Sequence, residues 1–271
     1  MPQNLFDLSG QVIVVTGSTG ALAGAVARHL VENQAEVVFL GRSEEKLAQT
    51  LSSLGNPTNA TPFACDVTDR DGLQEVRQAV LDKFGRIDGL INGAGGNMPG
   101  ATIPPGKTVF DLDLADYDQV LELNLKGTLI PSLVFSEPMV SAARGSIINF
   151  SSASSAQALT RVLGYSNAKA AVDNLTRWMA TDFAKKGLSN LRVNAVCPGF
   201  FIGDQNRALL LNSDGSLTER GQQIVAKTPM GRFGEADEVC GAVHFLLSPA
   251  SKFVTGQILS IDGGFGIYTG V

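Results

Sequence analysis

The sequence predicts an α/β fold: a single-domain, doubly wound parallel seven-stranded sheet of the Rossmann type, with helices on both faces. Short segments that are apolar throughout alternate with longer segments of helical periodicity along the 271 residues. Such strands are typical of a parallel sheet buried on both sides, and right-handed crossovers then cover both faces with helices. No linker or repeat interrupts the alternation, so residues 1–271 are expected to form one domain.

The individual elements follow from this alternation. Seven apolar runs are expected to be strands, at residues 12–16, 36–40, 61–65, 87–92, 146–150, 191–196 and 257–261. Helices are expected at residues 20–33, 43–54, 69–84, 114–141, 164–186 and 236–247. Ser43 favours a helix start because its short side chain can cap the first turn. Pro131 and Pro138 are expected to interrupt or end the helix that contains them.

Two segments stand outside the alternation. Residues 93–115 are rich in Gly and Pro and are expected to form a loop. Residues 200–232 follow the sixth strand, are long and polar, and are expected to form a substrate lid within the domain. Ligands of doubly wound sheets bind beyond the carboxyl ends of the strands, so the chemistry is expected in the segments that follow those ends.

Composition excludes several classes of protein. Charged residues make up 17% of the chain and the net charge is -5, without the clustered Lys and Arg of a nucleic-acid-binding surface. No apolar run is long enough to span a membrane, and residues 1–10 do not resemble a signal peptide. Cys65, Cys197 and Cys240 are odd in number and far apart, which favours reduced core cysteines in a cytoplasmic protein over disulfides or a metal site.

The segment after the first strand favours a dinucleotide site. Residues 16–24 read Thr-Gly-Ser-Thr-Gly-Ala-Leu-Ala-Gly and open the first helix, whose free N–H groups could receive a pyrophosphate. An ordinary tight turn between a strand and a helix could have the same sequence pattern. The second strand ends in Gly41-Arg42, where Arg42 could pair with a 2′-phosphate or simply lie on the surface; NADP(H) is therefore favoured, with NAD(H) possible.

The ends of the third and fourth strands carry further candidates. Asp66 could accept a hydrogen bond from an adenine amino group or cap the helix that follows Val67. The small residues of Asn92-Gly93-Ala94-Gly95 would let the backbone pass close to a cofactor.

Tyr165 and Lys169 are four residues apart in a predicted helix and therefore share a face. An ammonium beside a phenol lowers the pKa of the phenol and makes it a usable acid or base near neutral pH. Ser152 follows the fifth strand and could donate a hydrogen bond to a carbonyl oxygen. Taken alone, the Tyr-x-x-x-Lys spacing is better explained by a solvated helix face.

The combination of motifs is far more specific. The chain carries, in order, Thr16-Gly17, Asn92-Gly93-Ala94-Gly95, Asn124, Ser152, Tyr165-Ser166-Asn167-Ala168-Lys169, Pro198-Gly199 and Asp262-Gly263-Gly264. The sequence resembles the short-chain dehydrogenase/reductase superfamily over essentially its whole length. The resemblance implies hydride transfer between a nicotinamide and a carbonyl or alcohol carbon, without a metal.

The resemblance also implies roles for individual residues. Tyr165 would exchange a proton with the substrate oxygen, Lys169 would hold the nicotinamide ribose and lower the pKa of Tyr165, and Ser152 would polarise the carbonyl. Asn124 would hold a water in a proton relay. The implied cofactor contacts are Gly17, Ser18, Thr19, Gly20, Leu22, Arg42, Asp66, Val67, Asn92, Ala94, Gly95, Tyr165, Lys169, Pro198, Gly199 and Ile202.

Two departures from the superfamily pattern affect the cofactor site. Ala21 and Ala23 stand where the pattern has Gly, and the Ala23 methyl group is expected where backbone and cofactor approach. Gly203 stands where many relatives carry a Thr that binds the nicotinamide carboxamide, so Ile202 and the neighbouring backbone, or a water, would have to orient that group.

Several segments resemble the D-mannonate oxidoreductase (fructuronate reductase) branch of the superfamily, which implies a sugar acid or keto-sugar as substrate. Arg161 and Arg207 could hold a carboxylate, although each would also fit a surface salt bridge. Asn97, Gln205 and Asn206 could bind hydroxyl groups. Polyol or ketose reduction, 3-oxoacyl thioester reduction and a non-catalytic redox sensor remain as alternatives. The resemblance implies a homo-oligomer, a tetramer or dimer, built through the helices of Asn124 and Tyr165.

Overall fold

The sheet has the predicted architecture. The computed structural model describes residues 4–203 and 206–270, which contain a seven-stranded sheet of order β3-β2-β1-β4-β5-β6-β7 in which every neighbouring pair is parallel. The strands are β1 (Val12–Thr16), β2 (Glu36–Gly41), β3 (Ala60–Ala64), β4 (Gly89–Asn92), β5 (Gly145–Phe150), β6 (Leu191–Pro198) and β7 (Ile258–Ile261). Each begins and ends within two residues of its predicted range, so the predicted doubly wound sheet is confirmed.

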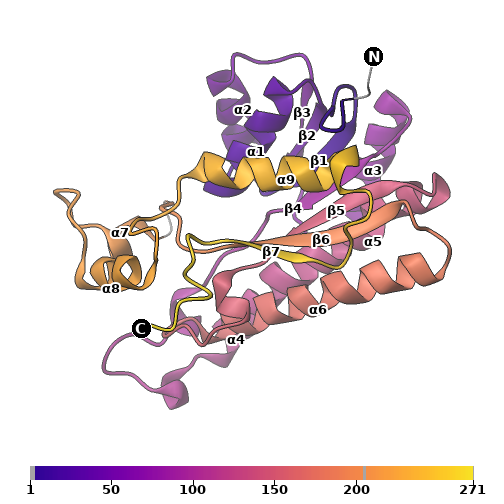
Figure 1. Cartoon of the computed structure of the whole chain (residues 1–271). Helices are drawn as coiled ribbons and strands as arrows, with labels where there is room; N and C mark the ends of the chain where they lie inside the picture. Colours follow the sequence, from indigo (N-terminus) through magenta and orange to yellow (C-terminus); the bar gives the residue numbers. More distant parts are fainter. Residues whose placement is uncertain (1–3, 204–205, 271) are drawn as a thin grey trace.

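Alternate side chains of each strand enter two different cores (Figure 1). Ile13 and Val15 of β1 pack against α1 (Ala21–Glu32) and α9 (Cys240–Leu247), with α2 (Glu44–Ser53) on the same face. Val12 and Val14 face α3 (Arg70–Phe84), α5 (Gly127–Ser141) and α6 (Leu163–Lys185). Both faces are therefore covered by helices, which explains why the strands are apolar throughout.

The helix that carries Asn124 differs from the prediction. It runs as α4 (Leu114–Leu121), a π-helical turn (Glu122–Lys126) and α5, with Pro131 and Pro138 inside α5. The expectation that the prolines interrupt or end the helix is therefore wrong. The change in hydrogen bonding falls on the turn that contains Asn124, and such π turns often occur at functional sites.

The predicted loop at residues 93–115 is confirmed, apart from two short 3-10 turns at Pro99–Ala101 and Val109–Asp111 and the first residues of α4. The predicted 236–247 helix begins as a 3-10 turn (Ala236–Val239) and continues as α9. The three cysteines are free; Cys197 and Cys240 are buried, and Cys65 is half-buried.

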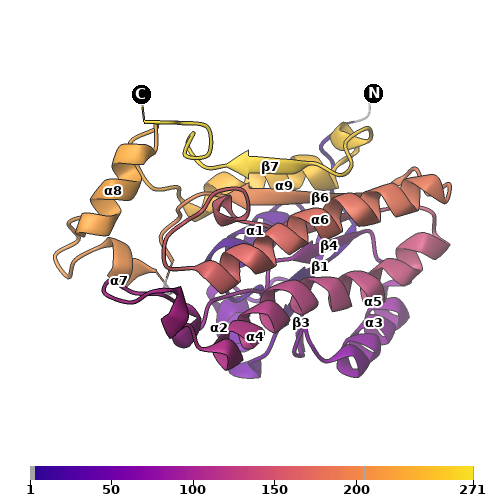
Figure 2. The same cartoon turned by 90° about the horizontal axis from the view of Figure 1, so that it is seen from below.

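The segment after β6 folds into two short helices, α7 (Arg207–Leu210) and α8 (Glu219–Lys227). Figure 2 shows both at one end of the molecule, beside the C-terminus. Leu210 and Ile224 pack with Ala153 and Phe265 in a small core of their own. Since β6 ends at Pro198, this unit lies at the carboxyl edge of the sheet, where ligands of such folds bind.

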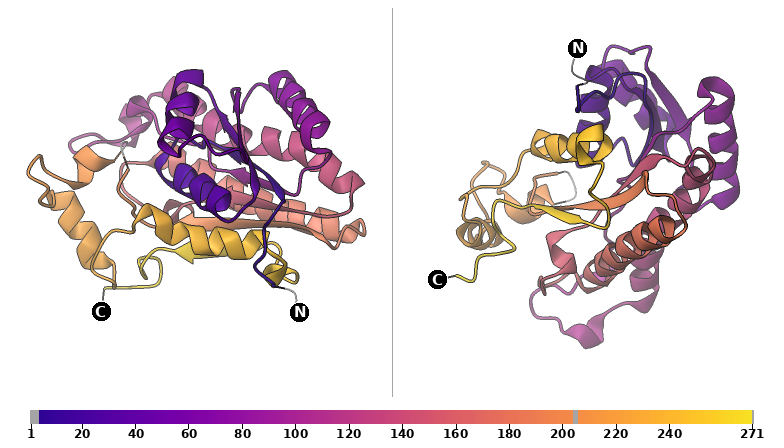
Figure 3. Two further views of the ribbon diagram at one scale, coloured as in Figure 1. Left: turned by 90° about the horizontal axis from the view of Figure 1, so that it is seen from above. Right: turned by 45° about the vertical axis from the view of Figure 1, so that its right-hand side comes forward.

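The opposite edge holds the two histidines. His29 in α1 and His244 in α9 are joined by a hydrogen bond of 2.9 Å between His29 Nε2 and His244 Nδ1. His244 Nε2 donates to the carbonyl of Phe6 at 2.6 Å, which ties the N-terminal segment to α9. Figure 3 shows that segment running past one end of α9.

Candidate active site

The turns after β1 and β4 are locked together. Gly17 has φ +67°, and a Cβ there would lie 2.7 Å from the amide nitrogen of Ala94. Thr16 Oγ1 accepts hydrogen bonds from the amides of Gly93 at 3.1 Å and Ala94 at 3.2 Å. Gly17 is thus required for the close approach of a second turn as well as for its own backbone conformation.

The first turn of α1 fits an anionic group. Its N-cap, Gly20, provides no side-chain cap, and no acidic residue lies in the first turn. Thr19, Gly20 and Ala21 are exposed, and Leu22 is half-buried. The N–H groups of this turn are therefore open to a phosphate at the positive end of the helix dipole. Ser18 differs from the expectation, because its side chain is buried and donates to the carbonyl of Leu40 at 3.3 Å.

The two alanines of this turn do not face the cofactor in the way expected. The Ala23 methyl group is buried, and a Cβ on Gly93 would meet it at 2.5 Å. The expectation that it lies between backbone and cofactor is wrong, because it fills the core between two turns. Ala21 lies close to Gly203, the glycine that stands where many relatives carry a Thr. A Cβ on Gly203 would lie 3.4 Å from the Ala21 Cβ.

Arg42 and Asp66 lie close enough to influence one another. Burial raises the pKa of Asp66, but hydrogen bonds from Thr68 and the positive charge of Arg42 outweigh it and the net shift is downward. Asp69, not Asp66, caps α3, so the capping alternative for Asp66 is wrong. Arg42 is exposed and follows β2 directly, whereas the side chain of Val67 is buried and only its backbone can meet a cofactor.

The side chains of Asn92 and Asn124 both form internal hydrogen bonds, although Asn92 Oδ1 is buried without a partner among the described residues. The Asn92 side chain is buried and donates to Ser132 Oγ and Asn149 Oδ1, both at 2.8 Å. Asn124 Nδ2 donates to the carbonyls of Gly96 and Val120, while its Oδ1 accepts from the Gly96 amide.

Gly95 lies between Asn124 and Lys169. A Cβ on Gly95 would be 2.7 Å from Asn124 Oδ1 and 3.3 Å from Lys169 Nζ. A side chain at this position would therefore collide with Asn124 and crowd Lys169, so the close approach of this backbone requires glycine.

The structure brings Ser152, Tyr165 and Lys169 together at the same edge. Ser152 starts the turn after β5, and α6 begins eleven residues later and carries the other two. Lys169 Nζ donates to the carbonyl of Phe150 at 2.8 Å and lies 5.4 Å from the centroid of the Tyr165 ring. Ser152 Oγ accepts hydrogen bonds from the amide of Ser154 at 3.2 Å and from its hydroxyl at 3.1 Å.

The charges of this cluster differ from the prediction. Burial raises the pKa of Tyr165 above its ordinary value, and the Ser152 hydrogen bond opposes this shift only in part. Burial lowers the pKa of Lys169 to about 8, against the carboxylate of Asp173, which raises it. In this structure the lysine does not produce the expected lowering of the Tyr165 pKa, because its ammonium is directed at Phe150. The phenol is therefore protonated at neutral pH.

Several predicted ligand contacts are held by their own loops. Asn97 bonds to Thr102 and to the Met98 amide, and Asn206 bonds to the Gly203 amide and the Phe201 carbonyl. Their side chains thus close turns in this structure, in place of the expected open hydroxyl contacts. Gln205 lies outside the described residues.

The segment after β6 approaches both β7 and the small core formed by α7 and α8. Pro198 is buried and Gly199 is half-buried; a Cβ on Gly199 would lie 2.7 Å from the Asp262 Cβ. Ile202 packs at the margin of the small lid core. Arg207 is exposed at the start of α7 and has no carboxylate partner among the described residues.

The structure adds two charged residues that sequence reasoning missed. Arg220 of α8 donates to the side-chain and backbone oxygens of Thr160, next to Arg161. Asp173 is buried one helical turn after Lys169, and its Oδ1 has no hydrogen-bond partner in the described part of the chain. The four-residue spacing from Lys169 was a usable signal for Asp173, whereas only the fold brings Arg220 to Arg161.

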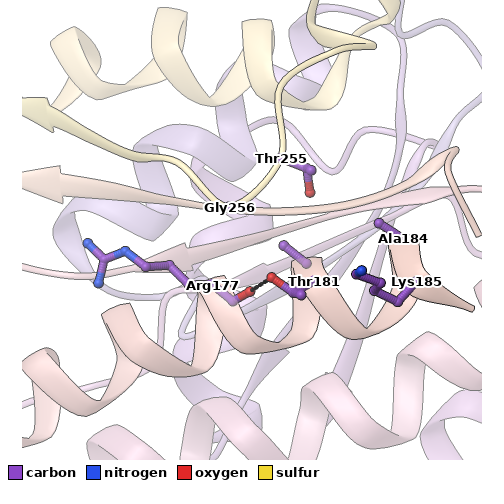
Figure 4. A pocket seen from close by; sticks show the side chains of 7 residues that line it. Arg177, Thr181, Ala184, Lys185, Thr255 and Gly256 are labelled. Atoms are coloured by element: carbon purple, nitrogen blue, oxygen red, sulfur yellow. Dashed lines mark hydrogen bonds between the residues drawn. The ribbon is translucent and has the colours of Figure 1, made fainter.

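A separate cavity of about 510 Å³ lies along the C-terminal half of α6 (Figure 4). Arg177, Thr181 and Lys185 line it from the helix, opposite Thr255 and Gly256. Arg177 is twelve residues beyond Tyr165, about 18 Å along the helix axis, so this cavity is not part of the cluster above. In the described residues there is no group of metal-ligating side chains and no helix long and apolar enough to cross a membrane.

Comparison with known proteins identifies the family. Residues 17–266 match a family model described as enoyl-(acyl carrier protein) reductase. The chain belongs to the short-chain dehydrogenase/reductase family. An oxidoreductase of Bacillus subtilis (strain 168), UxuB, whose activity is uncharacterised, is 40% identical over 277 residues that cover 98% of each chain.

Solved structures of the family agree in fold and hold a nicotinamide cofactor. A structure from Haemophilus influenza with bound NAD, provisionally named a D-mannonate oxidoreductase, has a TM-score of 0.89 and 37% identity over 99% of this chain and 100% of that one. A gluconate 5-dehydrogenase from Burkholderia cenocepacia J2315, in complex with NADP and tartrate, has a TM-score of 0.84 and 31% identity over 96% and 97% of the two chains. This short-chain family member is an NAD(P)-dependent oxidoreductase acting on an alcohol or ketone.

Proposed function

We propose that this protein reduces the keto group of a sugar acid or keto-sugar of the fructuronate type, with Tyr165 as the proton donor. The observation that carries the proposal is the buried Lys169, whose ammonium lies 5.4 Å from the centroid of the Tyr165 ring, at the edge of the sheet where Ser152 follows β5. Relatives named for mannonate and gluconate support a sugar acid as substrate.

The residues of the cluster have complementary tasks in this mechanism. A bound NAD(P)H supplies the hydride that adds to the carbonyl carbon and is itself oxidised. Ser152 holds the carbonyl oxygen next to Tyr165. As the C=O π bond breaks, the electron pair moves to that oxygen, and Tyr165 Oη transfers its proton to it. In this mechanism the Lys169 ammonium, 5.4 Å from the centroid of the Tyr165 ring, turns from the Phe150 carbonyl to stabilise the phenolate as it forms, and the Asn124 side chain holds the Gly96 backbone.

The protonation state of Tyr165 favours reduction. A phenol whose pKa is raised by burial holds its proton at neutral pH and is ready to give it to a carbonyl oxygen. Oxidation of an alcohol would need the phenolate as the starting form. We therefore expect reduction to be the faster direction near pH 7.

Tyr165→Phe tests the assignment. General acid catalysis is worth roughly 10²–10⁴ in rate, so kcat for NADPH-dependent reduction of D-fructuronate should fall by about that factor. Tyr117→Phe is the matched control, because its hydroxyl bonds to Asn167 on the surface. Unchanged turnover in Tyr165→Phe would exclude the mechanism and leave the redox-sensor alternative.

Assays with a panel of substrates test the proposed substrate class. Keto-sugar acids, neutral ketoses and 3-oxoacyl thioesters are compared at equal concentration with NADPH and with NADH. We expect the highest kcat/KM for a keto-sugar acid. A higher value for a thioester would assign the chain to 3-oxoacyl reduction, which the acyl-carrier description of the family model also fits.

We also propose that NADPH is preferred over NADH. Arg42 is exposed immediately after β2 and can pair with a 2′-phosphate. Arg42→Ala should raise KM for NADPH about tenfold or more, the worth of one hydrogen bond to a charged group, and leave KM for NADH unchanged. Arg28→Ala, an exposed arginine of α1, is the control. An equal effect on the two cofactors would exclude the phosphate contact.

A homo-oligomer in the reducing cytoplasm completes the proposal. The three free cysteines suit a reducing compartment. Exposed apolar side chains on α5 and α6 supply a surface for a second copy of the chain.

A further inference from the structure

Arg161 is held in a backbone conformation that arginine rarely adopts. It lies in the loop between Ser152 and Tyr165 and has φ +79°. Its carbonyl accepts a hydrogen bond of 2.9 Å from the amide of Ile103. A left-handed conformation costs a non-glycine residue about 1–2 kcal/mol and persists where the surroundings enforce it, often at functional sites. A glycine would fit this backbone better, so the arginine side chain needs another explanation.

The lid helix α8 brings a second arginine to the same loop. Arg220 Nη1 donates to Thr160 Oγ1 at 3.2 Å, and Nη2 donates to the Thr160 carbonyl at 3.3 Å. Further along α8, Lys227 donates to Gln157 of this loop at 3.2 Å. The lid and the loop that precedes Tyr165 are therefore joined at two points.

The two guanidinium groups are close and lack a negative partner. Burial lowers the pKa of Arg220, and the positive charge of Arg161 lowers it further. Neither arginine forms a salt bridge with a carboxylate among the described residues. Arg220 has five N–H donors and uses part of them on Thr160, so both side chains keep donors for an anion.

We propose that Arg161 and Arg220 together form the subsite for the carboxylate of the substrate, with Arg220 as a specificity-determining residue supplied by the lid. The inference rests on the proposed function and names the group of the sugar acid that these residues bind. Like charges from the loop and from α8 repel one another, and a carboxylate between them replaces that repulsion by attraction on both sides. Planar guanidinium groups suit a carboxylate because they can bind both of its oxygens. An anionic substrate would thereby favour the closed lid.

Steady-state kinetics test the subsite. Arg220→Met should raise KM for a keto-sugar acid by about 10- to 100-fold, the value of a hydrogen bond to a charged group, while kcat/KM for a neutral ketose stays within about twofold. Arg177→Met removes the same charge from the distant cavity on α6 and should change neither value. An equal loss on both substrates would mean that Arg220 only holds the lid, and would overturn the proposal.

A binding measurement separates this inference from the proposed function. Calorimetry with NADP-loaded enzyme compares D-gluconate with D-glucitol, which lacks the carboxylate. Wild type should bind gluconate more tightly, and Arg220→Met should abolish the difference. If the difference holds but no sugar acid is turned over, the proposed function fails and the subsite stands. No preference for gluconate in the wild type would overturn the subsite.

Arg161→Gly provides a second variant that is expected to fold. Glycine adopts φ +79° without strain, so the melting temperature should stay equal or rise while the preference for gluconate is lost. A large fall in melting temperature would show that the Arg161 side chain is structural and would contradict its place in the subsite.

Discussion

Lys169 and Asp173 lie one turn apart on the buried face of α6. They are 3% and 7% exposed, and no carboxylate lies within salt-bridge distance of Lys169 among the described residues. Burial removes the ammonium from water and lowers the pKa of Lys169, whereas the Asp173 carboxylate acts in the opposite direction. The balance, a pKa of about 8, keeps the lysine positively charged at neutral pH.

This balance predicts the pH dependence of reduction. The ammonium is present below a pH of about 8 and is lost as pH rises through that value. Because it stabilises the phenolate formed when Tyr165 gives up its proton, kcat/KM for reduction should fall as pH rises through about 8. Asp173→Asn removes the charge that raises the pKa, so the fall should move to lower pH. A pH–rate profile measures this shift.

Asp182→Asn is the control, because that carboxylate lies on α6 but pairs with Lys186 at the surface. If kcat/KM of Asp173→Asn were lower by the same factor at every pH, with its fall at the same pH as in the wild type, Asp173 would have a structural role only.

The family resemblance predicted the candidate catalytic residues but not their charges. Ser152, Tyr165 and Lys169 could be singled out because they occur in order with the other motifs of the family, and the structure places them after a strand and on one helix. The pKa shift of Tyr165 could not, because it depends on burial and on where the ammonium points. Ser18, Asn97 and Asn206 were chosen by residue type, and the structure shows that their side chains bond within the fold.

A chain of buried amides and hydroxyls connects the elements beneath the candidate site. Asn92 of β4 donates to Ser132 of α5 and to Asn149 of β5. Asn149 Nδ2 in turn donates to Thr176 Oγ1 of α6 at 2.8 Å. Side chains of β4 and β5 thus join α5, which follows the π turn of Asn124, to α6, which carries Lys169. Buried side-chain networks of this kind help to fix the relative positions of their members.

Asn149→Leu should disrupt this connection. Leucine has a similar size but leaves one N–H of Asn92 unpaired and removes the hydrogen bond that Thr176 Oγ1 accepts, at a cost of about 1–3 kcal/mol for the unpaired buried donor. We expect a melting temperature several degrees lower and a reduced kcat, because the helices no longer hold Asn124 and Lys169 in register. Asn174→Leu, an exposed change on α6, should alter neither. Equal melting curves for the two variants would contradict the importance of the network.

The strands were predictable because their apolar runs are sharply bounded, whereas the helix around Asn124 was not. A proline removes one hydrogen bond of a helix, and this predicted a break at Pro131. In the structure the helix accommodates both prolines, and Thr128 and Ser132 donate to carbonyls of the preceding turns. The π turn leaves no comparable signal in the sequence.

At the scale of the molecule, α5 and α6 present a shared outer surface. Figure 2 shows them side by side. Trp178 of α6 is 64% exposed, and Leu133 and Val140 of α5 are 45% and 37% exposed. Apolar side chains gathered on neighbouring helices are typical of a protein interface. A subunit contact here would involve the outer face of α6, the helix that also carries Tyr165 and Lys169.

Trp178→Glu tests whether this surface joins copies of the chain. A buried carboxylate without a partner is costly, so we expect the variant to form a smaller species than the wild type by light scattering. Phe253→Glu, a fully exposed aromatic residue after α9, should leave the mass unchanged. An oligomer of wild-type mass in Trp178→Glu would exclude this interface.

The histidine pair makes the far edge of the sheet sensitive to acid. Since His244 Nε2 donates to Phe6, its Nδ1 must accept from His29, and a second added proton would leave two cations facing each other. Burial and the neighbouring ring hold the pKa of His29 below its ordinary 6.5, so stability that is complete above pH 6.5 declines as pH falls below it. Mild acidification is thus expected to loosen the N-terminal segment first, while the edge that carries Tyr165 stays intact.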